Sequence, residues 1–256
     1  MTTLVEVCAG SAALTRHQLG LGKLVGFMGG KDGYAAAIVA AWGCPVLDAV
    51  WLNDPGLWGD VWLGLVLDPA VVAGVVAGWT GEPPRLLWER CRSTKATGYS
   101  ELAAARLCQL AGTYGGAEVG RFKGRHVRRP SVDGFIPSLV TLAARVAAVR
   151  FPVPVTTTAL DAAEVEVSGA WCYVDPPYRG TTGYAHELPR ERVVEVALRL
   201  AQRNRVAVSE GGPVAELVEA GWSAHELTAA RVGQRRRNSR SSAEWLTVSP
   251  REGGRA

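Results

Sequence analysis

The 256-residue sequence has no cysteine pair at CxxC spacing and no long apolar run, which excludes several classes of protein. The scattered cysteines argue against a zinc site or a disulfide framework, and they favour a reduced, cytoplasmic protein. The most apolar stretch, residues 61–79, is broken by Gly, Asp and Pro and does not reach the ~20 residues of a membrane span. The start lacks the basic segment of a secretory leader, so we expect no leader there. The five cysteines are Cys8, Cys44, Cys91, Cys108 and Cys172.

The net charge of +4 is unevenly spread along the chain. Residues 85–150 carry a net charge of +8, residues 231–240 carry +5, and the remaining residues carry −9. Two basic blocks on an acidic body predict a face that binds a polyanion, and a solvated surface is the alternative. Because the two blocks flank the candidate active strand described next, we favour nucleic acid as the partner.

An apolar run, Ala170 to Val174, ends at an acid and two prolines, Asp175-Pro176-Pro177, followed by Tyr178. Proline cannot donate to a sheet ladder, so the run predicts a strand that stops near Asp175. A carboxylate, a backbone carbonyl and an aromatic ring are then held at the carboxyl end of a strand, where open α/β sheets bind ligands. A tight turn after a core strand is the alternative interpretation.

Other predicted strands also end at small or polar residues. Residues 4–8 predict a strand that leads through Ala9-Gly10-Ser11-Ala12 into a helix, and a backbone turn of this kind lets a ligand approach closely. Residues 50–53 predict a strand that ends at Asp54, and residues 205–208 one that ends at Ser209. We therefore expect Cys8, Asp54, Asp175 and Ser209 at one edge of a doubly wound sheet.

These motifs together resemble phage-type, Dam-like DNA N6-adenine methyltransferases. Asp175 to Tyr178 resembles the Asp-Pro-Pro-Tyr motif of amino-methyltransferases, and Gly180-Thr-Thr-Gly-Tyr184 is similar to the residues that follow it in phage enzymes. Residues 26–38 resemble the Gly-Gly-Lys motif, here placed after the first strand-turn-helix as in a rearranged version of the family. The first motif departs from the family, since Cys8 stands in place of an aromatic residue and Ala12 in place of a second glycine.

The resemblance implies direct transfer of a methyl group from S-adenosylmethionine, which becomes S-adenosylhomocysteine, without a metal. It assigns catalysis to Asp175, Pro176, Pro177 and Tyr178. Asp54 is the expected ribose ligand or a helix cap, and Asp161 lies near the donor's adenine or caps a short turn. The donor-binding residues implied are Glu6, Cys8, Gly10, Ser11, Met28, Gly29, Gly30, Lys31, Asp54, Asp161 and Asp175.

The partner implied is DNA, most simply double-stranded. Residues 112–134 are rich in glycine and arginine, and Lys and Arg pair with phosphates while aromatics stack on displaced bases. A disordered, solvated loop is the alternative for this stretch. The residues expected to contact DNA are Lys123, Arg125, Arg128 and Arg129, then Thr181, Thr182 and Tyr184, and finally Arg235, Arg236 and Arg237.

The sequence thus predicts an α/β fold, a Rossmann-like methyltransferase sheet with helices on both faces. Residues 1–80 and 150–256 form the expected catalytic domain, and residues 81–149 form an inserted, mainly helical and loop region that recognises DNA. A bacterial cytoplasm and a phage or prophage origin are implied by the resemblance. Two alternatives stay open, namely an N4-cytosine DNA methyltransferase and a DNA-binding protein with a degenerate donor site. The sequence predicts neither the recognition site nor the oligomeric state.

Overall fold

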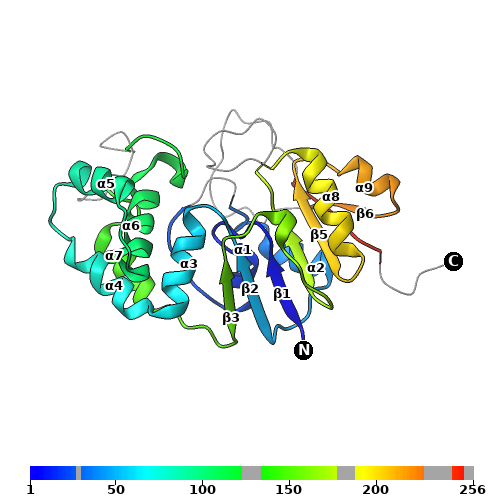
Figure 1. Cartoon of the computed structure of the whole chain (residues 1–256), viewed down its shortest axis with the longest axis horizontal. Coiled ribbons are helices and arrows are strands. Elements are labelled where there is room, and N and C mark those ends of the chain that lie inside the picture. Colours follow the sequence, from blue (N-terminus) through cyan, green and yellow to red (C-terminus); the bar gives the residue numbers. More distant parts are fainter. Residues whose placement is uncertain (27–29, 123–133, 178–187, 228–243, 251–256) are drawn as a thin grey trace.

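The computed structural model describes residues 1–26, 30–122, 134–177, 188–227 and 244–250, and it has an α/β architecture (Figure 1). The strands are β1 Thr3–Glu6, β2 Ala49–Asn53, β3 Val155–Thr158, β4 Trp171–Val174, β5 Arg205–Glu210, β6 Ser223–Leu227 and β7 Glu244–Val248. The helices are α1 Ala13–Gln18, α2 Ala35–Trp42, α3 Leu57–Leu67, α4 Pro69–Gly78, α5 Pro84–Ser93, α6 Tyr99–Gly112, α7 Leu139–Ala147, α8 Arg190–Ala201 and α9 Ala215–Glu219, with short 3-10 turns η1 Tyr114–Gly116 and η3 Ala162–Glu164.

The strands form one mixed sheet in the order β3-β2-β1-β4-β5-β7-β6. The first five are parallel to one another, and β7 is antiparallel to both β5 and β6. The chain order reverses direction between β1 and β4, which is the switch point where doubly wound sheets bind ligands. The predicted α/β class is therefore confirmed.

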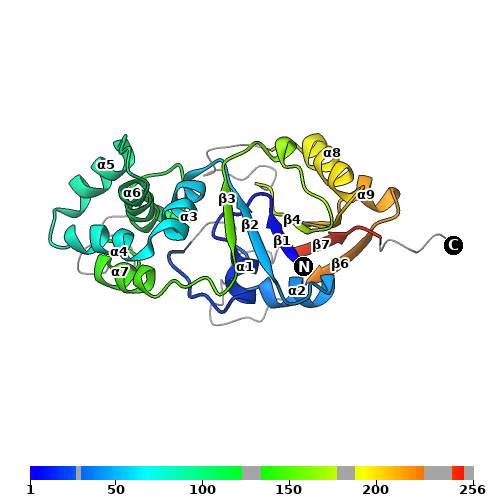
Figure 2. The same ribbon diagram turned by 60° about the horizontal axis from the view of Figure 1, so that its bottom comes forward.

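Helices cover both faces of the sheet. Successive side chains of a strand point to opposite faces, so neighbouring residues of one strand pack against different helices. Val5 and Val7 of the β1 segment pack on one face with the apolar stripe of α8, which includes Val193 and Val196. Leu4 of β1 packs on the other face with α1, α2 and α3. The views in Figures 1 and 2 place α8 and α2 on opposite sides of the sheet, which gives three layers.

A group of helices lies beyond the β3 edge of the sheet (Figures 1 and 2). In this group α4 packs against α6 and α7, and α3 packs against α6. The helices before residue 81 therefore pack with those after it, and the whole group is inserted between β2 and β3. Within the described ranges, no single helix is both long and apolar enough to cross a membrane, and α3 and α4 meet at 114°.

Candidate functional site

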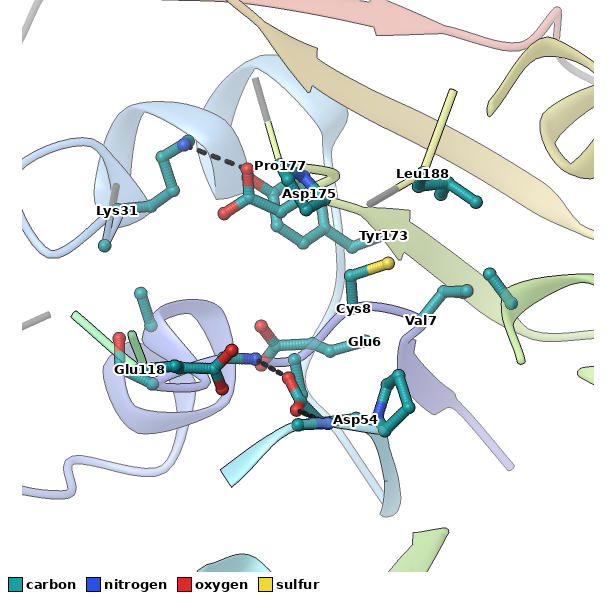
Figure 3. Close-up of a pocket in the computed structure, with 18 of the residues that line it drawn as sticks. Glu6, Val7, Cys8, Lys31, Asp54, Glu118, Tyr173, Asp175, Pro177 and Leu188 are labelled. Carbon is teal, nitrogen blue, oxygen red and sulfur yellow. Dashed lines mark hydrogen bonds and ion pairs between the residues drawn. The ribbon is translucent and has the colours of Figure 1, made fainter. Parts of the chain in front are cut away.

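A cavity of about 210 Å³ opens at the carboxyl edge of the sheet. Its floor is made by the ends of β1, β2 and β4, on either side of the switch point. Figure 3 shows side chains from these ends converging with Lys31 and Glu118, which come from loops. The parallel strands explain this convergence, because their carboxyl ends meet along one edge.

The cavity brings together most of the residues that the sequence assigned to the donor site. Pro177 of the catalytic motif also lines it, whereas Pro176 is buried and is not among the lining residues. The predicted donor-site residues that line the cavity are Glu6, Cys8, Gly10, Ser11, Gly30, Lys31, Asp54, Asp161 and Asp175.

The remaining predicted residues lie outside the described ranges, so their roles stay predictions. They are Met28 and Gly29 of the donor site, Tyr178 of the catalytic motif, and the expected DNA contacts Lys123, Arg125, Arg128, Arg129, Thr181, Thr182, Tyr184, Arg235, Arg236 and Arg237.

Asp175 forms an ion pair with Lys31 at the carboxyl end of β4. Lys31 Nζ lies 2.9 Å from Asp175 Oδ1 and 3.8 Å from Glu244 Oε1, and the Lys31 side chain is only 4% exposed. Glu244 also accepts a hydrogen bond from Ser209 Oγ at 2.7 Å. Burial raises the pKa of Asp175 to about 6, against the opposing effect of the Lys31 ammonium. The structure thus pairs the Asp175 carboxyl with a buried lysine, Lys31.

The Asp54 side chain links the turn after β1 to the turn after β2 through hydrogen bonds. Its Oδ2 accepts from the Gly10 backbone N–H at 2.7 Å, and its Oδ1 accepts from the Gly56 N–H at 2.8 Å (Figure 3). Burial and the nearby Glu118 carboxylate raise the pKa of Asp54 to about 6. Asp54 was also expected to cap the next helix. It is not itself the N-cap residue of α3, but it accepts a hydrogen bond from the backbone N–H of the residue that is, Gly56. A carboxylate has about four acceptor positions, so these two bonds leave room for ligand hydroxyls.

The turn after β1 contains two residues in the left-handed backbone conformation, and only one of them is glycine. Gly10 and Ala12 both have a φ of 47°, and Ala12 is fully buried. Glu6 accepts from the Thr15 N–H of α1 at 2.8 Å, and burial raises its pKa to about 7. Burial also raises the pKa of the Cys8 thiol, which keeps this side chain neutral. Cys8 therefore lines the cavity as a neutral thiol and is not activated as a nucleophile.

Asp161 caps a short turn, which is one of the two alternatives left open by the sequence. It is the N-cap of η3, where its side chain accepts from the Ala163 N–H at 2.8 Å and Glu164 completes a capping box. It also lines the cavity, beside Ala162. The cap therefore fixes the place of the Asp161 side chain on the cavity lining.

Glu118 is a lining residue that sequence reasoning missed. It is 9% exposed, and its Oε1 accepts from the Leu57 N–H of α3 at 2.9 Å. It lies in the glycine- and arginine-rich stretch that we interpreted as a DNA-recognition loop, where no periodic pattern marks an acid as internal. Its single sequence signal is that it is the one acid among residues 112–132.

The basic block at residues 85–150 is partly neutralised within the fold. Arg85 pairs with Glu89, Arg90 with Glu82, and Arg106 with Asp60. Arg92 lies over the Trp88 ring, 5.4 Å from its centroid. These pairs weaken the α5–α6 part of the block as a phosphate-binding face. Within the described residues, no group of three or more His, Cys, Asp or Glu is arranged to hold a metal ion.

In comparisons with known proteins, no family model matches this chain and no curated protein matches it.

Proposed function

We propose that this protein transfers a methyl group from S-adenosylmethionine to the N6 amino group of adenine in DNA. The observation that carries the proposal is that nine of the predicted donor-binding residues, Asp175 among them, line one cavity at the switch point together with Pro177. These residues come from five separate segments of the chain, and a chance set of turns has no reason to converge in this way. The mixed sheet is compatible with the Rossmann-like sheet that the resemblance implies.

The chemistry of the lining suits the donor. S-adenosylmethionine supplies an electrophilic methyl group on a positively charged sulfur when it is bound. Among the described residues, the lining contains five carboxyl groups (those of Glu6, Asp54, Glu118, Asp161 and Asp175) and one lysine, Lys31. Carboxylates favour a sulfonium and an ammonium, and they accept hydrogen bonds from ribose hydroxyls. Among the described residues, backbone N–H groups can donate to a ligand carboxylate, and Lys31 adds a positive charge while it pairs with Asp175.

The protein's own part in the reaction centres on Asp175. A base inside a duplex hides its amino group, so the target adenine must be flipped into the site. Asp175 Oδ and the Pro176 carbonyl would then accept hydrogen bonds from the amino group, which raises electron density on its nitrogen and orients its lone pair. The role needs an ionised Asp175, and the Lys31 ammonium at 2.9 Å favours that form. No covalent intermediate with the protein is required, in keeping with the neutral Cys8.

The test is a transfer assay with purified protein, tritiated S-adenosylmethionine and DNA, followed by digestion to nucleosides. Label in N6-methyladenine supports the proposal. Label in N4-methylcytosine would instead establish the cytosine alternative, which the same tetrapeptide serves. Asp175→Asn should remove transfer while leaving donor binding measurable, since Asn keeps the shape of the side chain and loses its charge.

The DNA-binding protein with a degenerate donor site is the second candidate, and it rests on Cys8 and Ala12. The conformation of Ala12 weakens it, because the turn keeps a left-handed residue even with a Cβ present. Calorimetry separates the two candidates. A protein that binds DNA and does not bind S-adenosylmethionine at millimolar concentration is not this enzyme.

A further inference from the structure

Asn53, the last residue of β2, lies directly before Asp54 and is fully buried. Its side-chain amide forms hydrogen bonds on both sides. Nδ2 donates to the backbone carbonyls of Val7 at 2.9 Å and Leu160 at 3.0 Å. Oδ1 accepts from the Leu160 N–H at 2.9 Å and from Thr158 Oγ1 at 2.7 Å. An amide group has two N–H donors and one oxygen with two lone pairs, so these bonds use its whole capacity.

The partners of Asn53 determine which residue type this position accepts. Carbonyl groups only accept and a backbone N–H only donates, so two donors and one oxygen must face them in a fixed arrangement. Aspartate has the same shape and lacks the donors, whereas leucine lacks both kinds of group. A buried carbonyl that loses its donor costs the desolvation of that group. The position therefore requires an amide of the length of asparagine.

The first link made by Asn53 is to the segment that follows β1. Its side chain donates to the Val7 carbonyl, and its backbone carbonyl accepts from the Ala9 N–H at 2.9 Å. Val7 and Ala9 both line the cavity, and Cys8 between them does so as well. Asn53 thus sets where the end of β1 lies relative to Asp54, the next residue of its own segment, which also lines the cavity.

The second link is to the segment that follows β3. The bonds to Leu160 hold the backbone directly before Asp161, which lines the cavity. The bond from Thr158 Oγ1 joins the same amide to the last residue of β3. One side chain, that of Asn53, therefore fixes the spacing between the two segments that carry Asp54 and Asp161.

We infer that Asn53 is a positioning residue for the nucleoside half of the donor, because it sets the spacing between the segments of Asp54 and Asp161. The inference rests on the proposed function, in which these acids lie at the ribose and near the adenine, and it deepens that function by naming what holds this half of the site in shape. Ligating groups must be held within about 0.5 Å of their productive places by supporting residues. The amide bonds do not reach Lys31 or Asp175, so the effect of Asn53 falls on donor binding and not on that ion pair.

Two substitutions and one control test this role. Asn53→Asp keeps the side-chain shape and replaces both N–H donors. Thr158→Val is a milder change, which keeps the shape and removes the hydroxyl that donates to Asn53 Oδ1. The control is Thr156→Val, the same replacement at an exposed position of β3.

Two measurements are made on each folded protein. Calorimetry compares S-adenosylhomocysteine with 5′-methylthioadenosine, which keeps the nucleoside and lacks the amino acid. Steady-state transfer at saturating DNA gives the donor KM and kcat.

We expect Asn53→Asp to weaken binding of both ligands by about 10- to 100-fold and Thr158→Val by about 3- to 10-fold, as for loss of several bonds and of one bond. The factor should be the same for the two ligands, since both carry the nucleoside. The donor KM should rise by a similar factor, while kcat at saturating donor stays within about twofold of wild type. Thr156→Val should match wild type throughout.

A purely structural role for Asn53 would lower the midpoint of urea denaturation and leave the affinity of the folded variants unchanged, and that result would overturn the inference. Weakening of S-adenosylhomocysteine alone, or a loss of kcat at saturating donor as large as the loss of affinity, would overturn it too. If Asn53→Asp does not fold, Thr158→Val decides by the same criteria. If wild-type protein binds neither ligand, the proposed function itself fails.

Discussion

Replacing Lys31 by methionine tests the link between the buried ion pair and catalysis. Methionine is similar in length to lysine and removes the charge that lies 2.9 Å from Asp175 Oδ1. In the wild-type protein burial raises the pKa of Asp175 from 3.8 to about 6, so the ionised form that the proposed mechanism needs is populated above about pH 6. A raised carboxyl pKa also means that this group favours the folded state at low pH and loses that contribution as pH rises from about 4 to about 6.

The size of the effect follows from the contact. An opposite charge at this distance lowers a carboxyl pKa by about 1 to 3 units, so its removal should move the midpoint of Asp175 ionisation to about 7 to 9. For a two-unit shift, the ionised fraction at about pH 7 falls from about nine-tenths to about one-tenth, a tenfold loss of rate. Removing the lysine of a buried pair should also cost about 3 to 5 kcal/mol of folding free energy where the carboxylates are charged. That cost should shrink near pH 5, where protonation relieves the buried charge.

The assay is single-turnover methyl transfer from tritiated donor to DNA, measured across the pH range for wild type and Lys31→Met. We expect the acidic limb of the profile to move upward in the variant, with urea denaturation at two pH values reporting the folding cost. Lys23→Met is the matched control, because Lys23 is 47% exposed, pairs with Asp32, and does not line the cavity. A folded Lys31→Met protein whose acidic limb coincides with that of wild type would refute the reasoning.

Three further substitutions and one matched control, at Ala104, test the site and its support. Gly56→Ala puts a methyl group against the Glu118 carboxylate, so we expect donor affinity in calorimetry to fall at least about tenfold with an unchanged circular dichroism spectrum; wild-type affinity would contradict the close approach. Ala12→Gly should change the free energy of unfolding by less than about 1 kcal/mol, because relief of the left-handed conformation offsets the lost methyl and the more flexible unfolded chain. The same change at Ala104, buried inside α6, should cost about 1 to 2 kcal/mol in urea denaturation, and equal costs at the two positions would disprove the strain at Ala12. Gly112→Ala places a methyl 2.5 Å from an indole carbon, so we expect a loss of about 1 to 3 kcal/mol in the same measurement with donor affinity retained.

Much of the local structure could be predicted from the sequence because it depends on near neighbours in the chain. The strand that ends at Asp175 is marked by an apolar run and two prolines, and α4 begins at the proline that follows Asp68. Helices α3 and α4 meet at Asp68 and Pro69, within the stretch 61–79 that the sequence shows to be broken. Helix α9 was not expected, because five residues carry too little periodic signal to mark a helix.

The convergence of strand ends could also be predicted, since parallel strands in a doubly wound sheet place their carboxyl ends together. This rule placed Asp54 and Asp175 at one edge without any knowledge of side-chain contacts. It did not predict that both oxygens of Asp54 bind backbone N–H groups, because those partners depend on how two turns pack.

Only the tertiary structure determined which charges meet in the cavity. Lys31 and Asp175 are 144 positions apart in the sequence. Glu118 accepts a hydrogen bond from the backbone N–H of Leu57, which is 61 positions away. Such pairs depend on how loops cross the sheet edge and on where a missing Cβ, as at Gly56, leaves space. The sequence by itself therefore determined the elements and the candidate chemistry of this protein, because these follow from local preferences. The packing of distant segments determined the partners, the pKa values and the place of Glu118, because those depend on burial and distance.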